Sequence, residues 1–207
     1  MKRILTCALC WLSATAYSAP SFDVAGRTVV VDATREDYVR YRLPVPDSKI
    51  TAGQAEALID APAADVVEVL RQYSEYRNFL PFFTDSQFVK KHEDFNELRL
   101  KAKILHGTVS IDAFVSVKER TLEDQVTEFD MRLIRGNIER LDSRWTVYPV
   151  SDNRSMVVFY LMVDPDLWFA KNTTLSEYNW VNCGRTVRAL RERVLAKGAA
   201  PGPATSN

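Results

Sequence analysis

The feature of this sequence that most constrains its fold is an alternation of apolar and polar residues that runs, with short interruptions, through the middle of the chain. A period of two is that of a β-strand with one buried face. Turn-forming residues such as His106-Gly107 and Arg135-Gly136-Asn137 separate the segments. We therefore predict an antiparallel meander with one apolar face. Its alternating segments are 98–104, 109–117, 127–133 and 141–147, and they are followed by a strand over 156–163 that is apolar on both faces.

Two short helices are expected before the meander. A strand over 50–60 comes first, and Pro62 then suits the first turn of a helix. A second helical turn over 74–79 ends ahead of Pro81, because the residue before a proline is pushed out of the α region. The first helix has an apolar stripe at i, i+3, i+4, i+7 spacing, formed by Val66, Val69, Leu70 and Tyr73.

A long helix over 175–196 is expected after the meander. A sheet with one apolar face needs a cover, and this helix is the only predicted element long enough to supply it. We therefore predict an α+β fold in which a curved antiparallel sheet of about seven strands wraps around the helix. Gly184 costs the helix about 1 kcal/mol relative to alanine, so we expect something bulky to approach it closely. The apolar stripe of this helix consists of Trp180, Cys183, Val187, Leu190 and Val194.

Three segments together resemble the START-like helix-grip superfamily, which includes polyketide cyclases and coenzyme-Q-binding proteins. They are IDAPAADVVEVLRQYSEYRNFLPFF (59–83), GNIERLDSRWTVYP (136–149) and Val163-Asp164-Pro165. Their order and spacing carry the resemblance, which spans residues 50 to 197. It implies a helix-grip fold and an internal site for a hydrophobic small molecule.

The chain is expected to have four parts. Residues 1–16 have a positive start, a short apolar run and the small-x-small pattern Ala14-Thr15-Ala16, and they are predicted to be a signal peptide, with cleavage after Ser18 as the alternative. Residues 21–48 are a leader that we expect to pack on the domain. Residues 49–197 form the helix-grip domain, and residues 198–207 are expected to be disordered. Export to a bacterial periplasm or secretion would follow.

Composition and motifs exclude several functional classes. Lys and Arg number 27 and Asp and Glu also 27, so nucleic-acid binding is not expected. The only histidines, His92 and His106, lie in predicted turns, and Cys183 is the one cysteine beyond the predicted signal peptide. No metal site, cofactor site or disulfide is therefore predicted. Among charged residues that could orient a ligand, strand parity places Asp112, Asp130 and Arg144 outside and leaves Arg135, unless a bulge reverses the parity.

Aromatic side chains are abundant on the elements expected to face inward. They fit either a filled core or an apolar ligand cavity, and the sequence pattern does not separate the two. Either Phe159 or Tyr160 faces inward from its strand, and we assign Tyr160. The candidate cavity residues are Phe79, Phe83, Leu100, Ile111, Phe129, Trp145, Tyr160, Trp180, Gly184 and Val187.

Three functional hypotheses follow. The first is a non-catalytic, monomeric binder or carrier of a hydrophobic small molecule such as a lipid, an isoprenoid or a quinone-like compound. It would have no stable membrane insertion and at most a transient membrane contact. The second is an enzyme of the cyclase, dehydratase or hydrolase type that uses the same cavity. The third is an envelope interaction protein whose core is filled.

Overall fold

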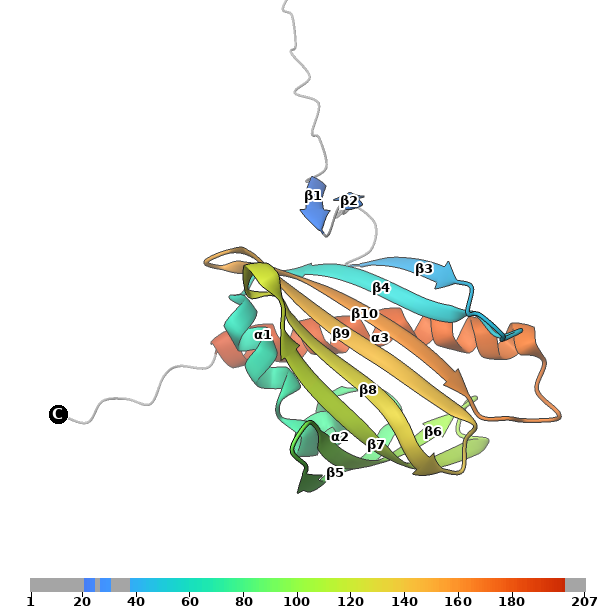
Figure 1. Cartoon of the computed structure of the whole chain (residues 1–207). Coiled ribbons are helices and arrows are strands. Elements are labelled where there is room, and N and C mark those ends of the chain that lie inside the picture. Colours follow the sequence, from blue (N-terminus) through green and yellow to red (C-terminus); the bar gives the residue numbers. More distant parts are fainter. Residues whose placement is uncertain (1–20, 25–26, 31–37, 200–207) are drawn as a thin grey trace, which may run out of the picture.

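The computed structural model describes residues 21–24, 27–30 and 38–199 of the 207-residue chain (Figure 1). The predicted signal peptide, 1–16, lies outside the described residues, as does the predicted tail beyond Ala199. Gly198 and Ala199 belong to the last helix. Near the start of the chain, β1 (Ser21–Val24) and β2 (Arg27–Val30) pair as a separate two-stranded antiparallel sheet.

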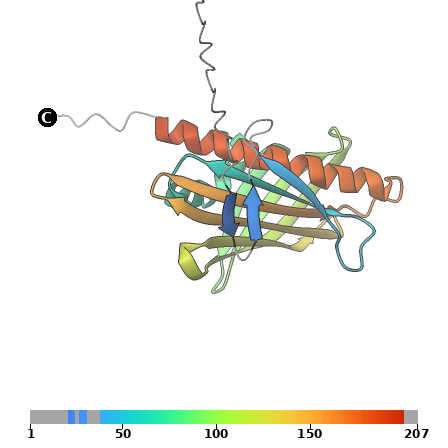
Figure 2. The same ribbon diagram turned by 90° about the horizontal axis from the view of Figure 1, so that it is seen from above.

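The main sheet has eight antiparallel strands in the order β3-β4-β10-β9-β8-β7-β6-β5. The α+β helix-grip fold is confirmed: the sheet curls around one long helix, α3 (Figures 1 and 2). The strands are β3 (Val39–Leu43), β4 (Ala52–Ile59), β5 (Phe83–Lys91), β6 (Asn96–Ile104), β7 (Val109–Thr121), β8 (Thr127–Gly136), β9 (Arg140–Ser151) and β10 (Arg154–Asp164). The helices are α1 (Ala63–Leu70), α2 (Tyr76–Phe79) and α3 (Asn172–Ala199).

The two short helices carry the chain from β4, near one edge of the sheet, to β5 at the opposite edge. As predicted, α2 ends ahead of Pro81. The predicted alternation is also observed, since Leu98, Leu100, Ala102 and Ile104 are all buried on β6. Strand β5 lacks this alternation because it is an edge strand whose last five side chains are exposed.

Helix α3 packs on β4 and β10 through a buried asparagine. Asn179 is fully buried, and its Nδ2 donates to the backbone oxygens of Thr51 (3.1 Å) and Val163 (3.3 Å). Its Oδ1 accepts a hydrogen bond from the Val163 amide (3.2 Å). Gly53 permits this close approach, because a Cβ at that position would lie 2.3 Å from the backbone oxygen of Asn179. We call this contact the Asn179–Gly53 seam.

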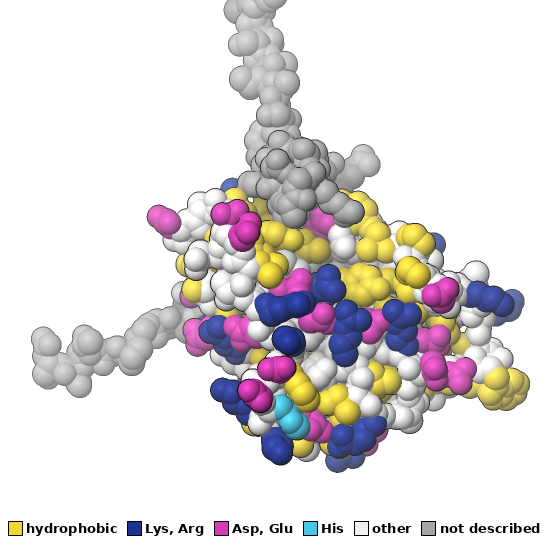
Figure 3. All heavy atoms as spheres, viewed as in Figure 1, with side chains coloured by type: hydrophobic (Ala, Val, Ile, Leu, Met, Phe, Trp, Pro, Cys, Tyr) yellow, Lys and Arg dark blue, Asp and Glu magenta, His cyan; other side chains and the backbone are white. Residues whose placement is uncertain are grey.

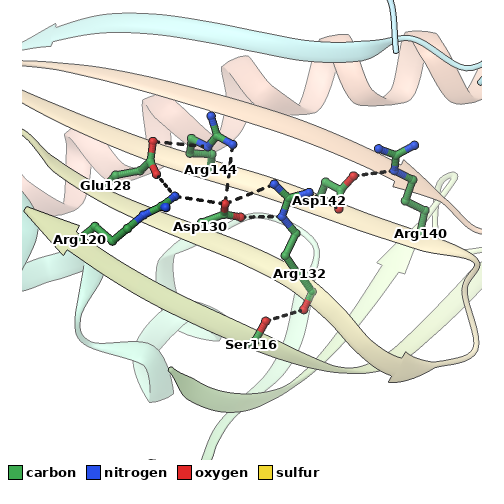
Figure 4. A network of polar contacts seen from close by, with 8 residues as sticks. All are labelled: Ser116, Arg120, Glu128, Asp130, Arg132, Arg140, Asp142 and Arg144. Atoms are coloured by element: carbon green, nitrogen blue, oxygen red, sulfur yellow. Dashed lines mark hydrogen bonds and ion pairs between the residues drawn. The ribbon is translucent and has the colours of Figure 1, made fainter. Parts of the chain in front are cut away.

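The outer face of the sheet carries interleaved charges across β7, β8 and β9 (Figures 3 and 4). Arg132 bonds Asp130 (2.7 Å) on its own strand and Asp142 (3.0 Å) on the next. Arg120 contacts both Glu128 and Asp130, and Arg144 contacts the same two carboxylates. Asp130 and Arg144 therefore lie outside, as strand parity predicted, and each carboxylate of this network faces arginines on neighbouring strands.

Replacing Gly53 by alanine tests the seam. The added methyl group must push β4 and α3 apart, so we expect the free energy of unfolding to fall by about 1–3 kcal/mol, the usual cost of overpacking. Urea unfolding measures the loss. The matched control is Gly198→Ala, because a Cβ there meets nothing within 4 Å. Equal stability of the two variants would contradict the seam.

The outer network predicts an acid-sensitive contribution to stability. Burial alone would raise the pKa of Asp130, but the hydrogen bond from Arg132 and the surrounding arginine charges leave it below its ordinary value. A carboxyl with a depressed folded pKa stabilises the fold above its unfolded pKa, about 3.9, and that contribution disappears as pH falls through the folded value. We therefore expect the free energy of unfolding to decrease below about pH 4.

Asp130→Asn should flatten this part of the pH profile, as measured by urea unfolding at a series of pH values. Asp152→Asn is the control, since Asp152 is an exposed aspartate outside the ion pairs of the described residues. Parallel profiles for the Asp130→Asn variant and the unaltered protein would mean that the network does not contribute to acid sensitivity.

Candidate functional site

An enclosed apolar cavity of about 80 Å³ lies between the inner face of the sheet and α3. We call it the inner cavity. Trp145 and Phe159 stack across β9 and β10 on its wall, with ring centroids 4.0 Å apart. Its wall is formed by Tyr76, Leu80, Phe82, Phe83, Leu100, Ala102, Ile104, Ile111, Ala113, Met131, Leu141, Ser143, Trp145, Phe159, Leu161, Val163, Tyr178 and Thr186.

The polar side-chain groups of this wall are four hydroxyls and the indole N–H of Trp145. The Tyr76 hydroxyl donates to the Leu70 backbone oxygen (2.5 Å), and Thr186 donates to that of Asn182 (2.7 Å). Ser143 and Tyr178 have no hydrogen-bond partner within residues 38–199. Burial raises the pKa of Tyr178, so its hydroxyl stays protonated and can donate to a ligand.

A larger groove of about 1010 Å³ opens at one end of the inner cavity, between the β6–β7 turn, the β10–α3 connection and the first half of α3. We call it the mouth groove. Phe82 and Tyr178 line both spaces, and their ring centroids are 5.9 Å apart. Phe82 has a φ of 80°, which is rare for a bulky residue and costs of order 1–3 kcal/mol. These two rings therefore separate the inner cavity from the mouth groove.

The structure brings four of the predicted residues together on the inner cavity wall: Phe83, Leu100, Ile111 and Trp145. Three others belong to the same hydrophobic core but lie off this wall. Phe129 and Val187 are fully buried, and Phe79 is half-buried with its ring edge-on to Tyr76.

The assignment of Tyr160 to the interior is corrected by the register of β10. Phe159 lies opposite Trp145 and faces inward, which turns Tyr160 to the outer face. There it lines a groove together with Glu128 and Asp142. Because this strand is apolar on both faces, the alternation of residues does not indicate whether Phe159 or Tyr160 faces inward.

Trp180 and Gly184 also face away from the inner cavity. Trp180 lies beneath the guanidinium groups of Arg40 (4.0 Å) and Arg42 (4.6 Å) from β3. A Cβ at Gly184 would lie 2.3 Å from the Tyr38 ring. The bulky group expected at Gly184 is therefore a side chain beside β3, and the glycine does not make room for a ligand.

Of the two α3 residues that reach the inner cavity, Tyr178 is one of the aromatic residues expected to face inward, although it was not among the candidate cavity residues, and Thr186 was missed because it is polar. The apolar stripe pointed to Trp180, whereas Asn179, Asn182 and Thr186 are the buried polar residues of α3. Tyr178 and Thr186 reach the inner cavity. An interpretation that allowed hydrogen-bonded polar residues on the inner helix face would have found Thr186.

No His, Cys, Asp, Glu, Lys or Arg side chain lines the inner cavity. His92 stacks on Phe95 and contacts Glu97 (3.0 Å), and His106 lies in the exposed β6–β7 turn. Cys183 is buried off the wall, and burial raises its pKa to about 12. Within residues 38–199, no three His, Cys, Asp or Glu side chains come close enough to hold a metal ion.

Arg135, the charged candidate that strand parity left for the interior, is exposed. The pairing of β7 with β8 shifts register between Phe114 and Val115, and this bulge turns Arg135 outward. Its guanidinium lies 3.7 Å from the centroid of the Phe114 ring and contacts Glu97 (3.1 Å). Asp112 is also outside, paired with Arg99 (2.6 Å).

The fold is shared with solved structures at low sequence identity. A STAR-related lipid transfer protein from Xanthomonas axonopodis matches with a TM-score of 0.69 at 19% identity, over 77% of this chain and 94% of that one. Human StAR-related lipid transfer protein 5 matches with a TM-score of 0.68 at 11% identity, over 79% and 86%. A Zhui aromatase/cyclase from a Streptomyces species matches with a TM-score of 0.59 at 14% identity, over 80% and 97%.

No curated protein matches the sequence. A family profile does: the one described as polyketide cyclase/dehydrase and lipid transport matches residues 59–175, more than half of the chain. This match confirms the resemblance that the segments at 59–83 and 136–149 predicted. The chain therefore belongs to the polyketide cyclase/dehydrase and lipid transport family, within the START-like helix-grip superfamily.

Proposed function

We propose that this protein binds a hydrophobic small molecule, such as a lipid, an isoprenoid or a quinone-like compound, without transforming it. The observation that carries the proposal is the wall of the inner cavity, which has no charged side chain. Among residues 38–199, only the hydroxyls of Ser143 and Tyr178 and the indole N–H of Trp145 on this wall lack a hydrogen-bond partner. Such a wall favours burial of apolar surface, about 25 cal/mol per Å². The two hydroxyls suit a ligand with one or two polar atoms.

The size of the cavity sets a condition on binding. About 80 Å³ is well below the roughly 300–1,000 Å³ of a pocket for a drug-sized ligand. Rotation of Phe82 and Tyr178 would join the inner cavity to the mouth groove, which is large enough. We therefore propose that the ligand occupies both spaces, with its apolar part inside.

The main alternative is an enzyme, supported by the similarity to an aromatase/cyclase. Acid–base chemistry would then be performed by Tyr178, the one titratable group in the described residues that lines both the inner cavity and the mouth groove. Burial raises its pKa, so it is suited to donate a proton and poorly suited to accept one. This favours binding over catalysis.

Filling the inner cavity tests the proposal. Ala113 is fully buried on its wall, and Ala113→Leu adds three carbons to that space. If the cavity receives a ligand, the variant should keep its melting temperature and lose most of its binding of N-phenyl-1-naphthylamine, followed by fluorescence. Extraction and mass spectrometry of the purified protein should recover a hydrophobic compound that the variant lacks.

The control is the same substitution at Ala57, which is equally buried but off the cavity wall. Overpacking there should lower stability by about 1–3 kcal/mol. Two results together would show that the core is filled. The unaltered protein would not bind the probe, and Ala113→Leu and Ala57→Leu would lower stability equally. A recovered compound that is chemically changed on incubation would instead favour the enzyme.

We also propose that the chain is exported, on the evidence of the Lys2-Arg3 start, the apolar run 4–12 and Ala14-Thr15-Ala16. N-terminal sequencing of the protein from a bacterial periplasmic fraction should begin at Tyr17 or Ala19. Ala16 is a small residue required by both cleavage positions, so Ala16→Arg should leave the chain uncleaved. A mature protein that still begins at Met1 would contradict the proposal.

A further inference from the structure

Two adjacent aromatic side chains project from the connection between β10 and α3. Trp168 is 94% exposed and Phe169 is 54% exposed, and their rings meet edge to face with centroids 5.7 Å apart. Trp168 is the most exposed of the large hydrophobic side chains described. Solvation of a whole indole ring is unfavourable, and an exposed aromatic cluster of this kind marks an interaction surface.

This aromatic pair lies beside the opening of the site. Phe169 and Ala170 line the mouth groove, and they face the β6–β7 turn across it. In Figure 1 the β10–α3 connection and the β6–β7 turn protrude at the same end of the molecule. A partner that covers Trp168 and Phe169 would therefore also cover the mouth groove.

The charges around the groove indicate the sign of the charge that this partner carries. Lys103, Lys171 and Arg185 line it and are exposed, and none has a carboxylate within ion-pair distance among residues 38–199. Arg185 is also close enough to lower the pKa of Tyr178 against the effect of burial. The arginines of the outer face, by contrast, are paired with carboxylates (Figure 4).

The acidic residues near the groove do not neutralise these cations. Glu177 lines the groove but pairs with Arg42 from β3. Asp164 ends β10 and Asp166 follows in the connection, and the Asp164 carboxylate accepts the Asp166 amide hydrogen (2.9 Å). The groove therefore presents exposed cations next to exposed aromatic rings.

We propose that this end of the molecule, defined by Trp168, Phe169, Lys103, Lys171 and Arg185, docks on an anionic lipid surface. Tryptophan settles at the boundary between headgroups and acyl chains, where its ring is apolar and its N–H stays hydrated. Each lysine or arginine near such a surface adds about 1 kcal/mol of attraction. None of the helices in the described part of the chain has the length and apolarity to cross a membrane.

Vesicle co-sedimentation of the full chain tests the proposal. Binding to phosphatidylcholine vesicles that contain phosphatidylglycerol should exceed binding to phosphatidylcholine alone and should weaken with added salt. The double variant Trp168→Ala/Phe169→Ala should lose about tenfold or more in partitioning, since each ring buries a large apolar surface. Lys171→Gln should lose about fivefold.

The matched control is Phe88→Ala, which removes an exposed phenylalanine from β5, away from the mouth groove. It should partition like the unaltered protein. Brominated acyl chains give an independent readout, because they quench only tryptophan that enters the membrane. The quenched fraction should fall in Trp168→Ala relative to the unaltered protein, because Trp11 is common to both, Trp145 is buried and Trp180 is covered by arginines.

Three results would overturn the proposal: no preference for the anionic vesicles, equal partitioning of the aromatic double variant and Phe88→Ala, or equal quenching with and without Trp168. A dimer that dissociates in Trp168→Ala, without vesicle binding, would assign the surface to self-association instead. Vesicle binding is measured without a ligand, so it stands or fails separately from the proposed binding function. Likewise, the single variant Trp168→Ala, whose side chain lines neither the inner cavity nor the mouth groove, should keep its binding of N-phenyl-1-naphthylamine.

Discussion

The close contact between Asn179 and Gly53 is the constraint on which the rest of this structure depends. Because the helix backbone lies directly on β4, α3 has one permitted register on the sheet. Hydrogen bonds from one asparagine side chain to Thr51, the residue before β4, and to Val163 on β10 tie the helix to both places at once. That register directs Tyr178 and Thr186 to the inner cavity and places Trp180 against Arg40 of β3. A buried amide would be costly without its partners, so this contact also discriminates against a shifted helix.

The fold could be predicted because its main signals are local. Alternation fixed the inner face of β6 through β9, and Pro81 fixed the end of α2. The site was less accessible because its geometry depends on contacts between distant segments. Nothing local distinguishes Phe159 from Tyr160 on a strand that is apolar on both faces. A bulge beside Phe114 turns the Arg135 side chain from the inner to the outer face. Helix α3 meets the sheet through Asn179 as well as through its apolar stripe.

Charge is distributed according to what each surface faces. On the outer face of the sheet, arginines and carboxylates alternate across strands, so each partly buried carboxylate is compensated by neighbours. Inside, the wall is uncharged and its hydroxyls are few. At the mouth groove, the cations are left without carboxylates in the described chain. The three environments differ in what they can bind, although the net charge from 27 basic and 27 acidic residues is zero.

The inner cavity is small and the mouth groove is large because two side chains, Phe82 and Tyr178, close the space between them. An empty apolar cavity forfeits contacts along its wall, so a protein without ligand is more stable when side chains close the space. Phe82 and Tyr178 stand where such closure separates the two spaces, and the left-handed backbone of Phe82 makes that closed arrangement costly. A ligand or a lipid surface at the mouth groove would need to compensate only the difference in free energy between the closed and the open arrangements of Phe82 and Tyr178. Under the proposed binding function, strain at Phe82 reduces that difference in free energy, and we expect the ligand to enter at this position.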